Sequence, residues 1–187
     1  MEISREHPLR KLFEELVRRH YFGDAQIYDS DVAEYVSGVV TDLAHVDTLY
    51  KIRNARGEQL TDLAAMLIES NPLLEANSFD REREVRKQVG DFTLFFTGLF
   101  PEAVASLPTL RPLSIDKFVD YVNAGKESYA VVAAFNVFEY AEEAPLFRRM
   151  SDRFEQCVFG LNLVKRDIEN LQGGPFGDRR DGYGLWG

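Results

Sequence analysis

The chain has very little cysteine and histidine. Cys157 is the only cysteine among 187 residues, so no disulfide can form within one chain. The three histidines stand far apart, and no Cys/His spacing typical of a zinc site occurs. An unpaired cysteine suits a reducing compartment, and the charged N-terminus lacks the apolar stretch of a signal peptide. We therefore expect a cytoplasmic protein.

Long apolar runs and excess basic charge are also missing. The longest apolar run, residues 92–100, is about half as long as a membrane span and contains Thr93 and Thr97. Lysine and arginine number 22 against 31 acidic residues, which gives a formal net charge of −9. Nucleic-acid phosphates and anionic lipid headgroups repel such a chain. We expect neither a membrane span nor a nucleic-acid partner.

The sequence lacks the P-loop motif of phosphate binding and the nucleophile turn of serine hydrolases. No G-x-x-x-x-G-K-[ST] loop is present, and no serine occupies a G-x-S-x-G turn. Cys157 falls on the apolar seam of a predicted helix, where a cysteine behaves as a small hydrophobic residue. These observations favour a protein that is not an enzyme, and they predict no cofactor.

The most apolar segment, residues 86–100, predicts a central helix. Its apolar side chains recur at spacings of four and three residues, as on one face of a helix, and further phenylalanines and leucines widen that face almost all round. Such a helix needs neighbours on several sides. Ser78 is well placed to cap it, and the acidic residues after Ser78 suit a helix N-terminus.

Several other segments show helical periodicity, and no pair of segments resembles a β-hairpin. The fold class that follows is all-α: a single-domain bundle of about five to seven helices over residues 1–172, followed by a disordered or peripheral Gly-rich tail over residues 173–187. Gly125 either ends its helix or lies inside a longer one. Besides the central helix, the expected helices cover residues 8–22, 32–53, 58–69, 115–125 or 115–140, and 145–171.

One group of residues has the spacing of a metal site. Asp42 and His45 stand three residues apart and can face the same side of a helix, with Glu34 two to three turns earlier. Di-iron bundles use two Glu-x-x-His motifs and two further glutamates, and the second His-containing motif is missing here. The alternative function is therefore a metal- or small-ligand-binding bundle that uses Glu34, Asp42, His45 and Asp91. It covers an oxidase-like di-metal site, a haem site or a small apolar ligand.

Asp91 is the only ionisable residue in the apolar part of the central helix. A carboxylate among phenylalanines must be paired, hydrogen-bonded or protonated. One interpretation is a structural ion pair with Arg81, Arg86 or Lys126. The other is an acid with a raised pKa in a functional pocket.

The C-terminal segment combines glycine with large apolar residues. Residues 173–187 include six glycines and the only tryptophan. Aromatic side chains often anchor protein interfaces, and a flexible segment can fold on a partner. The leading hypothesis is a non-catalytic module that binds another protein or a second copy of itself. Its predicted docking residues are Phe176, Tyr183, Leu185 and Trp186.

Overall fold

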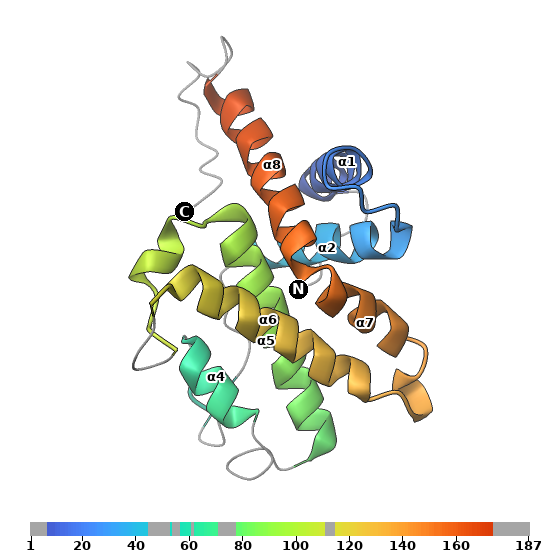
Figure 1. The fold of residues 1–187 in the computed structure, drawn as a ribbon, viewed down its shortest axis with the longest axis vertical. Coiled ribbons are helices and arrows are strands. Elements are labelled where there is room, and N and C mark those ends of the chain that lie inside the picture. Colours follow the sequence, from blue (N-terminus) through green and yellow to red (C-terminus); the bar gives the residue numbers. More distant parts are fainter. Residues whose placement is uncertain are drawn as a thin grey trace.

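A computed structural model describes residues 7–44, 53, 57–60, 62–70, 78–110 and 115–173. This part of the chain contains seven α-helices, two 3-10 helices and no β-strand (Figure 1). The prediction of an all-α helical bundle is confirmed. The elements are α1 (Pro8–Phe22), α2 (Ser30–Leu43), α4 (Leu63–Glu69), α5 (Phe79–Leu99), η1 (Ala103–Ser106), α6 (Lys117–Ala134), η2 (Phe138–Tyr140), α7 (Ala144–Asp152) and α8 (Phe154–Gly173).

Helix α5 lies at the centre of the bundle, as its broad apolar surface predicts. It packs against α2, α4, α6 and α8, and α1 packs in turn against α2 and α8. Of its 21 residues, 13 between Arg83 and Leu99 are buried. Figure 1 shows α6 crossing α5, and α8 extending past the other helices at the end away from η2.

Polar side chains fix the points where several helices begin. The Ser78 hydroxyl accepts a hydrogen bond from the Arg81 N–H at the start of α5 (3.1 Å). The Asp29 carboxylate accepts one from the Val32 N–H at the start of α2 (3.2 Å). Such caps satisfy N–H groups that have no partner in the first turn of a helix. The Ser78 cap agrees with the sequence-based expectation.

Helix α2 is shorter than its apolar stripe predicts. The helix predicted from this stripe reaches residue 53, but α2 ends at Leu43, and residues 45–52 lie outside the described part. The β-branched residues and Gly38 lower the helix propensity of this segment, so its stability depends on packing against α1 and α5. The predicted helix over residues 45–52 stays a prediction.

The prediction of a single helix over residues 145–171 is wrong, because the chain forms the two helices α7 and α8 there. Arg153 leaves helical geometry between α7 and α8, at φ −113° and ψ 21°. Met150 and Phe154 are both fully buried on either side of the break. The apolar spacing therefore continues across it, and the spacing does not reveal that the helix ends.

Gly125 lies inside α6, so the longer of the two predicted helices forms, but it stops at Ala134 rather than at residue 140. Phe135 leaves helical geometry with ψ 77° and packs its ring edge-on against Phe79 of α5, with 6.4 Å between ring centroids. This tertiary contact replaces the last helical turns that the sequence predicts.

The buried apolar side chains of all seven described α-helices form one continuous core. Among the described residues, no helix combines the length and the hydropathy that a membrane span requires. The boundary after residue 172 stays a prediction, because residues 174–187 lie outside the described part.

Candidate functional site

Asp91 lies at a junction of three helices. It is 5% exposed. One carboxylate oxygen accepts hydrogen bonds from the Tyr35 hydroxyl of α2 (2.5 Å) and from the Tyr129 hydroxyl of α6 (2.8 Å). The other oxygen accepts one from the Lys87 ammonium, one turn earlier on α5 (2.9 Å). Asp91 is therefore paired and hydrogen-bonded, but its cation is Lys87 rather than any of the three that the sequence suggested.

Aromatic rings surround this carboxylate. The rings of Tyr35 and Tyr129 pack edge to face, with 6.2 Å between centroids. Both contact Phe147 of α7, at 5.3 Å and 5.7 Å. The Lys87 ammonium also lies over the Tyr35 ring, 5.2 Å from its centroid. Asp91 thus sits in an aromatic cage with donors on both of its oxygens, which satisfies a buried charge.

The protonation states around Asp91 favour a structural role. Burial raises the pKa of the Tyr35 and Tyr129 hydroxyls well above the ordinary value, and the Asp91 charge raises both further. Both tyrosines therefore stay protonated at neutral pH and act as donors, not as bases. Burial also raises the pKa of the Cys157 thiol to about 12, which keeps it from being a nucleophilic thiolate.

We predict that the protein loses stability steeply in alkali. Burial raises the pKa of Tyr21, Tyr35 and Tyr129 well above their ordinary value of 10.0, so the folded chain keeps protons that the unfolded chain releases. The stabilisation is fully present below pH 10.0 and is lost as the pH rises above it. Each tyrosine then lowers the free energy of unfolding by up to about 1.4 kcal/mol per pH unit. Urea unfolding from about pH 8 to pH 11 measures this slope.

A matched pair of variants isolates the effect. Tyr35→Phe removes one of the three hydroxyls with a raised pKa and makes the alkaline slope shallower by the contribution of one tyrosine. Tyr28→Phe alters a side chain that is 73% exposed and leaves the slope as it is in the wild type. A free energy of unfolding that stays level up to about pH 11 contradicts the prediction.

A cavity of about 240 Å³ adjoins Asp91 and brings together three of the four predicted metal ligands. Asp42 in its wall pairs with Arg10 of α1 (3.1 Å), just as Asp91 pairs with Lys87. No group of three or more metal-ligating side chains in the described ranges is placed to hold a metal ion. His45 lies outside those ranges, so the four-residue metal site stays a prediction. The charged lining residues are Arg10, Glu34, Asp42, Lys87 and Asp91.

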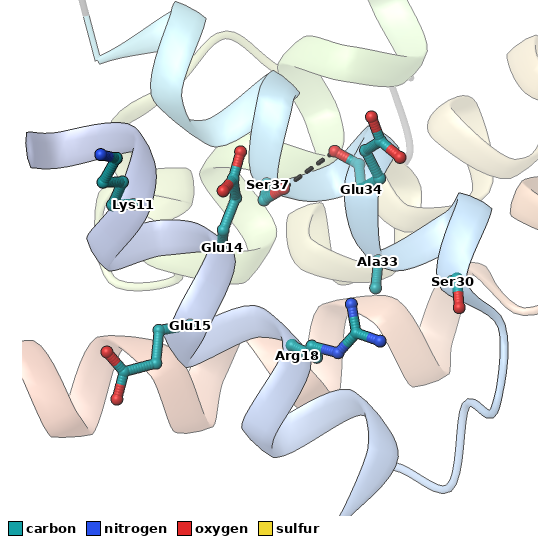
Figure 2. A pocket seen from close by; sticks show the side chains of 8 residues that line it. All are labelled: Lys11, Glu14, Glu15, Arg18, Ser30, Ala33, Glu34 and Ser37. Atoms are coloured by element: carbon teal, nitrogen blue, oxygen red, sulfur yellow. Dashed lines mark hydrogen bonds between the residues drawn. The ribbon is translucent and has the colours of Figure 1, made fainter. Parts of the chain in front are cut away.

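A second, more open groove of about 410 Å³ runs between α1 and α2. Figure 2 shows Glu14 and Arg18 reaching from α1 toward α2, whereas Glu15 points away. The Arg18 guanidinium lies over the Phe22 ring (5.3 Å), and Glu15 pairs with Arg19 (2.8 Å). Charges of both signs thus alternate along α1 without forming a catalytic set. The lining residues are Lys11, Glu14, Glu15, Arg18, Ser30, Ala33, Glu34 and Ser37.

Large apolar side chains are exposed at the start of α5 and in the turn after α6. Phe79 is 74% exposed, Val137 54% and Phe138 88%. Phe135 in this turn packs on Phe79, and the Tyr140 hydroxyl donates to Asp80 (2.8 Å). Both ends of the turn therefore contact the first turn of α5, which places the exposed side chains at one end of the bundle. We call Phe79, Phe135, Val137 and Phe138 the aromatic patch.

Phe138 has an unusual backbone for so exposed a side chain. Its φ is +52°, in the left-handed region. A residue with a Cβ atom loses about 1–2 kcal/mol there, and such strain is often found at functional sites. Sequence reasoning missed this patch because the longer of the two predicted helices reached residue 140, whereas α6 ends at Ala134. No signal in the spacing identifies the turn.

The four predicted docking residues of the tail, Phe176, Tyr183, Leu185 and Trp186, lie outside the described residues. Residues 182–187 match the letters of the dinucleotide-binding motif G-x-G-x-x-G. That motif is specific only between a strand and a helix, and the last described element before it is the helix α8. The letters alone therefore support no nucleotide site.

Comparisons with known protein families, with curated proteins and with solved structures find no match to this chain.

Proposed function

We propose that this protein is a non-catalytic cytoplasmic helical module that binds another protein. The observation that carries the proposal is the aromatic patch, in which Phe138 is 88% exposed on a strained backbone. Exposed apolar patches mark interaction sites, and aromatic side chains dominate the binding energy of many interfaces. Phe138 contributes little buried area to the fold, so its exposed ring and strained backbone are better explained by partner binding than by stability.

The chemistry of the buried polar groups agrees with a non-catalytic role. Asp91 accepts three hydrogen bonds and leaves no carboxylate oxygen without a donor. The raised pKa values of Tyr35, Tyr129 and Cys157 keep all three protonated at neutral pH. General bases and nucleophiles require the opposite shift.

The tail is the second part of the proposal. Phe176, Tyr183, Leu185 and Trp186 supply a further set of apolar anchors in a Gly-rich segment. The tail starts where α8 ends, and Figure 1 shows that end of α8 far from η2. The tail and the patch are therefore tested separately.

We predict that Phe138→Gly loses the partner without losing the fold. Glycine adopts φ +52° without the Cβ penalty, so the free energy of unfolding stays level or rises by up to about 1 kcal/mol. Partner capture falls at least about tenfold, as for a hot-spot aromatic residue. Affinity capture from an extract of the native host, read by quantitative mass spectrometry, measures the binding. Urea unfolding measures the stability.

Two further chains complete this experiment. Leu171→Ser alters another exposed apolar residue, 63% exposed on α8, and keeps full capture. A chain that ends at Gln172 lacks the tail, and its capture reports the contribution of the tail alone. If Phe138→Gly captures the same proteins in the same amounts as the wild type, the patch is not the binding site.

The metal- or small-ligand hypothesis remains a separate proposal. Its support is the cavity beside Asp91, where Glu34 and Asp42 line the same space. Metal analysis of the purified protein, with unfolding measured in the presence of added iron, manganese or zinc, tests it, because a ligand that prefers the folded state raises stability.

A further inference from the structure

The aromatic patch lies among acidic side chains. Residues 79–84 and 135–143, which form the patch and its surroundings, contain six carboxylates and two guanidinium groups. These 15 residues thus hold four of the nine net negative charges of the chain. Glu139 and Glu142 are both exposed beside the patch. Asp80 is exposed as well and accepts a hydrogen bond from the Tyr140 hydroxyl.

The two cations of this region pair with carboxylates other than Asp80, Glu139 and Glu142. Arg81 pairs with Glu69 (2.9 Å) and with Glu84 (3.0 Å). Arg83 is buried and pairs with Glu143 (2.5 Å). Among the described residues neither guanidinium pairs with Asp80, Glu139 or Glu142, so these three carboxylates give the exposed aromatic surface an acidic border.

We infer that the aromatic patch binds an apolar helical segment of another protein that is flanked by lysine and arginine; this inference rests on the proposed function. The exposed rings of Phe79 and Phe138 accept the apolar face of the segment. Asp80, Glu139 and Glu142 attract its basic flanks. Complementary charge of this kind raises the association rate and selects among partners that have similar apolar surfaces.

The same charges argue against a second copy of this chain as the occupant. A symmetric dimer places the same surface of both copies face to face. The acidic border of one copy then meets that of the other, and facing like charges oppose association. Self-association through the patch is accordingly an outcome that counts against the inference.

The test uses three synthetic peptides and the full-length protein. The peptides are fluorescein-labelled helices of about 18 residues with one leucine face. All remaining positions are lysine in the first peptide, glutamine in the second and glutamate in the third. Fluorescence anisotropy measures their binding at low and at physiological salt. We expect the lysine peptide to bind at least about tenfold more tightly than the glutamine peptide, and the difference to shrink as salt is added. The glutamate peptide binds most weakly.

Three variants locate the binding. Phe138→Gly weakens binding of the lysine peptide at least about tenfold, which shows that the Phe138 ring contacts the peptide. The double variant Glu139→Gln/Glu142→Gln weakens the lysine peptide selectively and reduces its salt dependence. The charge-matched control Glu14→Gln/Asp152→Asn alters two exposed acids elsewhere and binds as the wild type does.

The contrary outcomes separate the inference from the proposed function. Equal binding of the lysine and glutamine peptides, both weakened by Phe138→Gly, overturns the basic partner but keeps the patch as a protein-binding site. If sedimentation shows that the wild type is a dimer and Phe138→Gly is a monomer, a second copy of the chain rather than a basic partner occupies the patch. Lysine-peptide binding that Phe138→Gly does not weaken, or no binding by that peptide, overturns the inference. Unchanged partner capture by Phe138→Gly overturns the proposed function itself.

Discussion

The Asp91→Ala variant is expected to lose about 3–5 kcal/mol of its free energy of unfolding. The substitution leaves the partly buried Tyr35 hydroxyl and the fully buried Tyr129 hydroxyl without their acceptor. A buried polar group without a partner costs about 1–3 kcal/mol, and the Lys87 ammonium loses its counter-ion as well. Urea unfolding at neutral pH measures the loss, which is large beside the roughly 5–15 kcal/mol that stabilises a typical domain.

Two companion variants make this expectation specific. Asp91→Asn keeps one oxygen acceptor and loses the charge, so its stability falls between those of the wild type and Asp91→Ala. Asp152→Ala changes an exposed carboxylate and shifts stability by less than about 0.5 kcal/mol. A loss below about 1 kcal/mol for Asp91→Ala shows that the three hydrogen bonds do not hold the helices together.

The partners of Asp91 show why sequence reasoning located this residue but not its role. Its isolation in an apolar helix was visible, and so was the need for a partner. Tyr35 and Tyr129 are 56 and 38 residues away in sequence, and no spacing rule connects residues so distant. Lys87 stands at i−4, a helical spacing that is readable from sequence, but in the less favourable order of charges.

The helices themselves were predicted better than their ends. The apolar stripes identified α1, α5 and α6, because a buried helix face needs apolar residues every three to four positions. The break at Arg153 was missed because buried residues continue at helical spacing across it. The turn after Ala134 was missed because α6 ends where Phe135 packs on Phe79, a contact that the local pattern does not reveal. The candidate binding surface lies in that turn, where tertiary contacts override the local pattern.

Gly125 illustrates the same limit, since the sequence left open whether it breaks α6. The structure places it where α6 packs against Thr93 of α5 and Phe154 of α8. A Cβ atom added at Gly125 overlaps the Thr93 hydroxyl and the Phe154 ring. The Thr93 hydroxyl is itself held by hydrogen bonds to the carbonyls of Val89 (2.8 Å) and Gly90 (3.0 Å), so it cannot move aside freely. This glycine permits the helix crossing rather than ending the helix.

Gly125→Ala is therefore expected to destabilise the protein by about 1–3 kcal/mol, although alanine is the better helix former by about 1 kcal/mol. Gly38→Ala is the matched control, because Gly38 also lies inside a helix and a Cβ atom there meets no atom within 4 Å. Without a clash, only helix propensity remains, and stability rises by about 0.5–1 kcal/mol. Urea unfolding of the two variants compares the signs directly. If both substitutions stabilise the chain, Gly125 is not packed tightly against Thr93 and Phe154, and the prediction is wrong.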